Sequence, residues 1–299
     1  MPIQRAVVTG ASGFVGSALL RQLPAEVAKL SLAADDWRQR IAATSWRGAT
    51  VFHLAAHVHR RGAGDEAGYQ RDNVDKTRAL AEAAARGGAR RLVFASSIKV
   101  NGEGTAGRPF TAADAPRPQD AYGRSKLAAE RMLQGLAGKE ALEVVVLRLP
   151  LVYGPGARGN LAAFLRLCDT PWPLPFGALR NRRSFVDVED VAALLVHAAA
   201  HGNAAGRTFL VAHPDPVSTA RLAETVRSAL GRPRRLLPVP PAWLRAAARL
   251  TGTSHAMERL TGDLEIDASD LERDLGWRAG IGLEASVGAM VAAYSRDAR

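Results

Sequence analysis

The feature that most constrains the fold is the alternation of apolar runs with helical patterns over the first half of the chain. We expect strands at 3–9, 27–32, 50–55, 91–96 and 142–149, and helices at 13–23, 36–43, 70–86 and 121–136. The later runs are apolar on both faces, as strands covered on both sides of a parallel sheet must be. The sequence therefore predicts an α/β fold with a doubly wound, Rossmann-like parallel sheet.

After about residue 150 the alternation gives way to turns rich in Pro and Gly, short helices and one clear strand at 207–212. We expect a dinucleotide-binding domain over residues 1–155, to which a later part at about 184–213 returns. A smaller C-terminal α/β lobe, mainly residues 156–299, would bind the substrate. Ligands of doubly wound folds bind at the carboxyl ends of the strands.

Composition limits the class of protein and its partners. With 299 residues, 47% hydrophobic and 23% charged, the chain is typical of a globular protein. Its net charge of +11 comes from scattered Arg residues without blocks of like charge, which favours a solvated basic surface over nucleic-acid binding. A single cysteine, Cys168, and the lack of a signal-like or membrane-spanning segment predict a cytoplasmic protein without a membrane span.

A glycine-rich turn, T-G-A-S-G-F-V-G at 9–16, lies between the first expected strand and helix. Gly10 would form the tight turn, and Gly13 would leave room for phosphates at the helix N-terminus, where free N–H groups stabilise negative charge. Gly16 would let the helix pack closely on the strand. The setting predicts dinucleotide binding, with an ordinary turn as the alternative.

The choice between NAD and NADP stays open at this stage. The acidic residue expected about 20 positions after the turn is Asp35 or Asp36. The stretch before these residues is short, and Arg38 and Arg40 follow directly.

Tyr122 and Lys126 stand four residues apart at the start of an expected helix, so their side chains share one helix face. A phenol is a poor base at neutral pH, but a nearby ammonium group and an oxidised nicotinamide would stabilise the phenolate. Ser97 ends the preceding strand, and its hydroxyl would donate to a carbonyl oxygen, whereas Ser96 should point the other way. These groups predict proton exchange with a substrate hydroxyl.

Taken in order, these motifs resemble the extended short-chain dehydrogenase/reductase family, specifically its nucleotide-sugar epimerases, dehydratases and reductases. Besides the glycine turn, the strings that carry the likeness are H-L-A-A at 53–56, D-N-V-D-K-T at 72–77, S-S-I-K-V-N-G-E at 96–103, Y-G-R-S-K at 122–126, L-R-L-P-L-V-Y-G-P-G at 147–156 and R-R-S-F-V-D-V-E-D-V at 182–191. The resemblance runs nearly end to end. It implies NAD or NADP as cofactor, a UDP-sugar substrate and a homodimer.

The resemblance also implies roles for individual residues. Tyr122 would transfer the proton, Lys126 would hold the nicotinamide ribose, and Ser97 would polarise the sugar oxygen. The expected cofactor-binding residues are Gly10, Ser12, Gly13, Phe14, Val15, Gly16, Asp35, Leu54, Ala55, Ala56, Asn73, Tyr122, Lys126 and Pro150, with Leu151 beside the nicotinamide. The expected substrate-binding residues are His57, Lys99, Asn160 and Arg183, and no metal site is expected.

The S-S-I-K-V-N-G-E string resembles enzymes that reduce UDP-4-keto-6-deoxy sugars for bacterial surface polysaccharides. We therefore expect an oxidoreductase acting at C4 of a UDP-hexose, with reduction of the 4-keto sugar as the first reading. A UDP-hexose 4-epimerase with retained NAD is the alternative, and a non-catalytic nucleotide-binding scaffold is a third. Ile98 and Lys99 stand where dehydratases of the family carry an acidic pair, so water elimination has no acid–base candidate.

Several other features have two interpretations. The cluster of His53, His57 and His59 favours a substrate contact by His57 over a metal site. The string R-N-R-R at 180–183 favours a diphosphate over nucleic acid or solvent. Many epimerases carry a second phosphate-binding arginine where this chain has Leu260, and Arg259 beside it is an uncertain substitute.

Two amphipathic helical patterns lie near the C-terminus. Residues 241–250 form a basic amphipathic pattern with a tryptophan on its apolar side. Packing on the small lobe is the favoured use of this pattern, and contact with a membrane surface is the alternative. The last helical pattern, with Leu283, Val287, Met290, Val291 and Tyr294 at helical spacing, predicts core or a dimer face.

Overall fold

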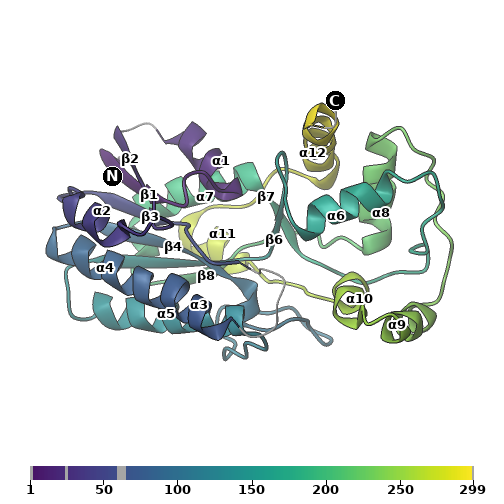
Figure 1. Ribbon diagram of the computed structural model, residues 1–299, viewed down its shortest axis with the longest axis horizontal. Helices are drawn as coiled ribbons and strands as arrows, with labels where there is room; N and C mark the ends of the chain where they lie inside the picture. The colour runs from purple at the N-terminus through teal and green to yellow at the C-terminus, as the bar shows by residue number, and fades with distance from the viewer. Residues whose placement is uncertain (1–2, 24–25, 59–64, 298–299) are drawn as a thin grey trace.

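The structure is a computed structural model that describes residues 3–23, 26–58 and 65–297, and it has a sheet-containing part and a mainly helical lobe side by side along its long axis (Figure 1). Six parallel strands form the main sheet in the order β2-β1-β3-β4-β5-β8. Their bounds are β1 Arg5–Thr9, β2 Glu26–Leu30, β3 Thr50–His53, β4 Arg91–Ser97, β5 Glu143–Leu149 and β8 Thr208–Leu210. The predicted doubly wound α/β fold is confirmed.

Helices cover both faces of this sheet because successive strand residues point to opposite sides. On one face, Val8 and Phe52 pack in a core with α1 (Phe14–Gln22) and α7 (Val188–Ala200). On the other face, Val7 and Val51 pack with α2 (Trp37–Ala43), α4 (Lys76–Arg86) and α5 (Ala121–Ala137). Both faces are therefore dry, which explains why the strands read as continuous apolar runs.

The expected helix at 70–86 differs from the observed one in its start and its regularity. The helical segment begins with α3 (Glu66–Tyr69), passes through a π-helical stretch, η1 (Gln70–Asp75), and continues as α4. A π-helical turn holds one residue more than an α-turn, so the 3.6-residue period cannot show it. The apolar run at 50–55 is also shorter as a strand, because β3 ends at His53 and the chain turns toward Gly10.

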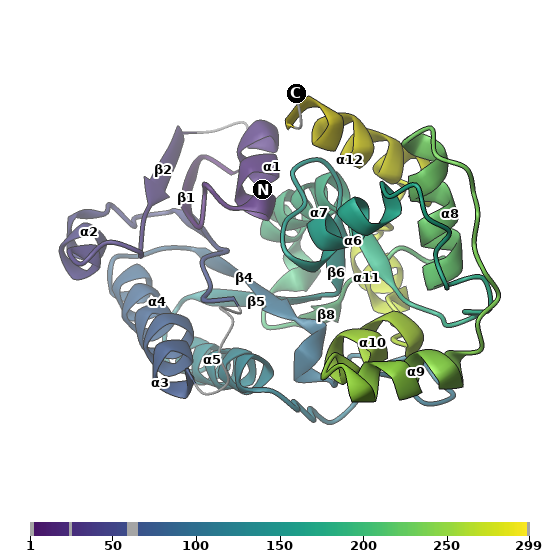
Figure 2. The ribbon, with the colours of Figure 1, turned by 45° about the vertical axis from the view of Figure 1, so that its right-hand side comes forward.

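The second part is built from segments on both sides of β8 in the sequence. A two-stranded parallel sheet pairs β6 (Leu151–Tyr153) with β7 (Phe185–Asp187). The remaining elements are η2 Ile98–Val100, α6 Asn160–Cys168, η3 Gly202–Ala204, α8 Thr219–Ala229, α9 Pro241–Leu250, α10 Ser254–Thr261, α11 Ser269–Leu275 and α12 Leu283–Asp297. Figure 2 shows α9 and α10 together at the far side of this lobe from α2.

The two C-terminal helical patterns have different fates. In α12, Leu283, Val287, Met290 and Val291 are buried in one core with residues of α6 and α8, so this face is core. In α9, Leu244 packs in that core and Ala248 is buried, but Trp243 is 71% exposed. The expectation that this tryptophan lies on the packed side of the helix is therefore wrong.

Two expectations about chain chemistry can be compared with the described residues. Cys168 is a free, buried thiol, and burial raises its pKa to about 12. Within residues 3–23, 26–58 and 65–297, no helix has both the length and the apolar character needed to cross a bilayer.

Candidate active site

The glycine turn between β1 and α1 brings three chain segments into close contact. Gly10 has φ +69°, and a Cβ there would lie 2.7 Å from the backbone nitrogen of Ala55. A Cβ on Gly16 would lie 2.2 Å from the carbonyl oxygen of Gly10, which is inside contact distance. Gly13 precedes the first helical residue and caps α1 without a side chain, so the free N–H groups of the helix stay uncovered. The turn has the close approach that a pyrophosphate requires.

A cavity of about 970 Å³ opens at the carboxyl ends of β1, β2 and β3, beside this turn. Of the residues predicted from sequence, it is lined by Gly10, Ser12, Asp35, Ala55, Ala56 and His57. Lys29, Ser31, Arg71 and Lys76 also line it and were missed, because their place depends on where β2 and the π-helical stretch end. The cavity and the close-packed glycine turn fit a nicotinamide dinucleotide, so these residues could hold one.

The adenosine end of such a ligand would lie near the end of β2. This strand stops at Leu30 and is followed by the exposed Ser31, so no carboxylate stands at the strand end itself. Asp35 lies further along, just before α2, and is exposed at the cavity wall.

A chain of hydrogen bonds links the glycine turn to Asn73. The N–H of Ala55 donates to the Thr9 hydroxyl, which lies 2.7 Å from His53 Nδ1. On the other side, His53 Nε2 lies 2.7 Å from the Thr77 hydroxyl, which donates to the carbonyl of Asn73. Because the Thr77 proton is used in this way, His53 carries its own proton on Nε2 and accepts at Nδ1. Burial lowers the pKa of His53 to about 3, so it is a neutral structural link between β1, β3 and η1.

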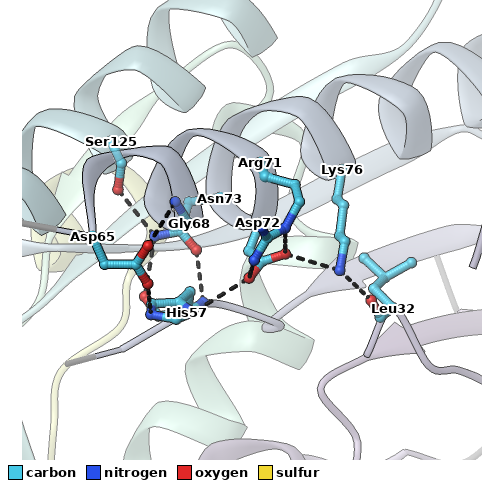
Figure 3. Close-up of polar contacts among 9 residues, drawn as sticks. All are labelled: Leu32, His57, Asp65, Gly68, Arg71, Asp72, Asn73, Lys76 and Ser125. Carbon is cyan, nitrogen blue, oxygen red and sulfur yellow. Dashed lines mark hydrogen bonds and ion pairs between the residues drawn. The ribbon is translucent and has the colours of Figure 1, made fainter. Parts of the chain in front are cut away.

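Asn73 fixes the loop after β3 to the helix that carries Tyr122 (Figure 3). Its amide oxygen accepts from the backbone N–H of His57 at 2.7 Å, and its nitrogen donates to the backbone carbonyl of His57 and to the Ser125 hydroxyl. Ser125 in turn donates to the carbonyl oxygen of Tyr122. The Asn73 side chain, predicted to bind cofactor, is thus engaged in positioning its neighbours.

The His57 ring lies between two carboxylates at the cavity wall (Figure 3). Its Nε2 is 3.3 Å from Asp65 and its Nδ1 is 3.3 Å from Asp72. Asp72 also pairs with Lys76 at 2.9 Å, and the two cations beside it, Arg71 and Lys76, hold its pKa near 2 against the effect of burial. His57 therefore belongs to an ionic cluster at the cofactor-sized cavity.

Ser97, Tyr122 and Lys126 meet where β4 ends and α5 begins. The N-cap residue of α5, Asp120, accepts from the N–H of Gly123, which fixes the helix start beside Tyr122. Lys126 is 2% exposed, donates to the carbonyl oxygen of Ala95 at 2.8 Å and lies 6.0 Å from the centre of the Tyr122 ring. Ser97 lies close enough to Tyr122 for its hydroxyl to lower the pKa of the phenol, against the effect of burial.

Burial controls the protonation of this group. It raises the pKa of Tyr122 far above its usual value, reinforced by Asp120 and Tyr69 and opposed by the nearby Ser97 hydroxyl. Burial also lowers the pKa of Lys126 to about 7, and the Glu130 carboxylate partly opposes that shift. The site by itself thus favours a neutral phenol, and added positive charge nearby would favour the phenolate.

A buried ion pair supports α5 from behind. Glu130 on α5 and Arg148 on β5 are 1% and 5% exposed, and their closest contact is 2.6 Å. Arg148 also donates to Asn101, and Ser96 donates to Glu130. The Ser96 hydroxyl is therefore turned into this network. The pair could not be predicted from the sequence, because only the packing of α5 on β5 brings the two residues together.

Lys99 lies at the opening beyond Ser97, where its backbone N–H donates to the Ser97 hydroxyl at 3.3 Å. Its ammonium group pairs with Glu103 at 2.8 Å and with Asp120 at 2.5 Å. These contacts place a charged cluster next to the start of α5.

The guanidinium groups of Arg183 and Arg259 lie near each other in the second part of the molecule. Arg183 donates to the carbonyl oxygen of Gly262 at 3.0 Å, and burial together with the charge of Arg259 lowers its pKa. One nitrogen of Arg259, Nη2, is buried and without a hydrogen-bond partner among the described residues. Two cations with an unsatisfied donor form a site for an anion with several oxygens. Arg259 therefore lies near Arg183, the residue expected from the sequence to bind the diphosphate.

The other predicted residues are spread around these centres. Phe14 and Val15 form the start of α1 and pack with Leu54 against the core, and Pro150 is buried between β5 and β6. Leu151 is 42% exposed, and Asn160 is the exposed first residue of α6. No group of three metal-ligating side chains occurs in the described part of the chain, and His59 lies outside it.

Comparison with known proteins decides the family. Residues 6–212 match the model of the NAD dependent epimerase/dehydratase family. The chain belongs to this family. The match confirms the resemblance seen in the sequence and the expectation of an enzyme that uses a nicotinamide dinucleotide.

Relatives with known names show what this family member is similar to. A UDP-glucose 4-epimerase of Vibrio cholerae is 36% identical, over 91% of this chain and 90% of the relative. A dTDP-4-dehydrorhamnose reductase of Mycobacterium tuberculosis is 31% identical, over 80% of each protein. The solved structure of MoeE5 in complex with UDP-glucose and NAD superposes with a TM-score of 0.75 at 26% identity, covering 99% of this chain and 100% of that one. Other structures of this fold hold NAD or NADPH.

Proposed function

We propose that this family member is a UDP-hexose 4-epimerase that keeps its nicotinamide dinucleotide through the reaction. The convergence of Tyr122, Ser97 and Lys126 at the carboxyl end of β4 carries the proposal. The relative that is 36% identical supports 4-epimerisation over the reduction expected first from sequence. Expectations of a homodimer, a cytoplasmic location and a role in surface polysaccharides form part of the proposal.

The cofactor cavity would be filled through the chain's own turn and loop. The N-terminus of α1 and the glycine turn would bind the pyrophosphate, and Ala55 and Ala56 would lie beside the dinucleotide. When bound, a nicotinamide dinucleotide supplies the acceptor and donor of the hydride at C4.

Tyr122 would move the proton that accompanies this hydride transfer. Its phenolate oxygen accepts the proton of the C4 hydroxyl when the ketone forms and returns it when the ketone is reduced. The Lys126 ammonium group would stabilise the phenolate, although burial by itself favours the neutral forms of both groups. Ser97 donates a hydrogen bond to the C4 oxygen, where negative charge develops.

The substrate would be held at its diphosphate while the sugar changes face. Arg183 and the unsatisfied nitrogen of Arg259 provide bidentate donors for the diphosphate. Lys99 and its carboxylate partners would contact the sugar, because they border Ser97 and Tyr122. His57 would lie at the cofactor side of the same opening. In an epimerase the 4-keto sugar must turn over, so that the hydride leaves from one face of C4 and returns to the other. The diphosphate is therefore the part of the substrate that needs a fixed position.

Reduction of a UDP-4-keto-6-deoxy sugar is the second candidate. It uses the same three residues, and similarity over 80% of a dTDP-4-dehydrorhamnose reductase favours it. The two reactions differ in the fate of the dinucleotide: a reductase consumes a reduced dinucleotide and releases it oxidised, whereas an epimerase regenerates the oxidised form and keeps it bound.

Incubation of the purified protein with UDP-glucose or UDP-N-acetylglucosamine, without added cofactor, tests the proposal directly. An epimerase produces the C4 epimer, which anomeric-proton NMR detects. The dinucleotide stays on the protein, so less than one equivalent per protein chain is found free in solution. A second assay adds UDP-4-keto-6-deoxy-N-acetylglucosamine with NADH or NADPH. Stoichiometric oxidation of the cofactor there, with no epimer in the first assay, would refute the epimerase and support the reductase.

A further inference from the structure

The outer edge of the helical lobe combines exposed tryptophans with exposed arginines. Residues 225–257 contain six Arg and no Asp or Glu, so this segment alone accounts for +6 of the net charge of +11. Only Arg227 among the six is buried. Charge in this chain is therefore concentrated on one segment, although the residues look scattered in sequence.

Two of the five tryptophans lie on this edge with most of their surface open to solvent. Trp172 is 73% exposed and Trp243 is 71% exposed, whereas Trp37 and Trp46 are buried in the sheet core. Leu250, at the end of α9, is 91% exposed. Large apolar side chains of this kind are rarely left in water in such numbers without a partner.

A bridge in the backbone joins the segments that carry these side chains. Leu174 pairs with Leu236, and the N–H of Leu237 donates to the carbonyl oxygen of Leu174 at 2.8 Å. Trp172 lies just before Leu174 in the chain, and the segment after Leu237 leads into α9, which carries Trp243. Figure 2 shows the chain from α8 to α9 running along the outer edge of the lobe.

The outward half of α9 has two flanks. At 100° per residue, Trp243 and Leu250 fall on one flank and Arg245 and Arg249 on the other, on either side of the face opposite the buried Leu244. A helix that lies in the plane of a bilayer surface has this arrangement, with apolar side chains reaching inward and guanidinium groups among the lipid phosphates.

We propose that this surface docks the enzyme on an anionic phospholipid bilayer. The Trp–Arg surface consists of Trp172, Leu237, Trp243, Leu250, Arg234, Arg235, Arg245 and Arg249. These four arginines have no carboxylate partner among the described residues; nearby Arg232 pairs with Asp169 at 3.0 Å. Tryptophan and arginine together match the interface between acyl chains and anionic head groups. The inference concerns location and is independent of the reaction at C4.

Co-sedimentation of the full-length protein with vesicles tests the proposal. Vesicles of phosphatidylcholine with about 30% phosphatidylglycerol should bind the protein, and vesicles of phosphatidylcholine alone should not. Binding should fall strongly at high salt, because surface charges are then screened.

Two variants separate the contributions of charge and apolar contact. R234S/R235S/R245S should weaken binding by about 100-fold, at about fivefold for each arginine. W172S/W243S/L250S should weaken it by at least about tenfold and should abolish the blue shift of tryptophan emission on binding. The substituted residues are exposed and have no contact with Tyr122 among the described interactions. Both variants should therefore have the melting temperature and the turnover of soluble substrate of the wild type.

The matched control is R78S/R86S/R131S, which removes the same charge from exposed positions of α4 and α5. Its binding should stay within about twofold of the wild type. The proposal is overturned if the wild type ignores anionic vesicles, or if the control loses as much binding as the first variant. It is also overturned if the tryptophan variant binds normally, which would indicate attraction to any polyanion such as RNA. A loss of self-association in that variant without vesicle binding would assign the surface to a second copy.

Discussion

Replacing Lys126 by Met should change the dependence of stability on pH. Lys126 is almost fully buried, and burial brings its pKa from 10.5 down to about 7. Between these values the unfolded chain binds a proton that the folded chain lacks, so the stability of the wild type rises with pH. The interval corresponds to about 5 kcal/mol in total, or about 1.4 kcal/mol for each pH unit. Below pH 7 the cost of the buried charge is fully present, and above 10.5 it is gone.

Urea unfolding of both proteins at pH 6, 7, 8 and 9 measures this effect, because the Met variant has no group to titrate at this position. Wild-type stability minus variant stability should be constant below pH 7 and should increase by about 3 kcal/mol between pH 7 and 9. Lys139→Met, at an exposed position just after α5, is the control and should show no such increase. A difference that stays flat for Lys126→Met, or shrinks as pH rises, would refute the assignment of a neutralised buried amine.

The other predictions concern proton transfer, cofactor choice, the buried pair and the anion site. Tyr122→Phe should lower turnover by at least about 100-fold with dinucleotide affinity nearly unchanged, measured by single-turnover kinetics and calorimetry. Ser31→Asp should raise the Kd of NADPH relative to that of NADH in fluorescence titrations, because a carboxylate at the end of β2 repels a 2′-phosphate. Glu130→Gln should destabilise the protein by about 3–5 kcal/mol in urea, and adding Arg148→Met should recover most of that loss. Arg259→Met should weaken UDP binding by about 10-fold to 100-fold in calorimetry and leave dinucleotide binding intact.

The sequence predicted the sheet and the closeness of Tyr122 and Lys126 because both depend on local patterns. Strands buried on both faces are apolar throughout, and the helical spacing of Tyr122 and Lys126 fixes their common direction. The glycine spacing also predicted a turn with close backbone contacts, and in the structure Gly10 and Gly16 have no space for a side chain.

What the sequence missed depends on contacts between distant segments. The π-helical stretch at Gln70–Asp75 changes the direction of Asp72 and Asn73, and its extra residue leaves no mark on the hydrophobic period. Glu130 meets Arg148 only through the packing of α5 on β5. The exposure of Trp243 follows from which flank of α9 the lobe covers, and an amphipathic pattern with several alanines leaves that choice open.

The return of the chain to the main sheet at β8 limits how such enzymes can be recombined. The strand Thr208–Leu210 lies between the two stretches that build most of the helical lobe, 151–187 and 211–297, and pairs with β5 at the edge of the main sheet. Within the second stretch, α11 packs in the core of the main sheet. An exchange of the lobe between two relatives therefore requires three junctions, two around the first stretch and one at the start of the second, and a single junction would combine half of one lobe with half of another. Engineers who wish to transplant substrate preference should place these junctions after β5, after β7 and after β8.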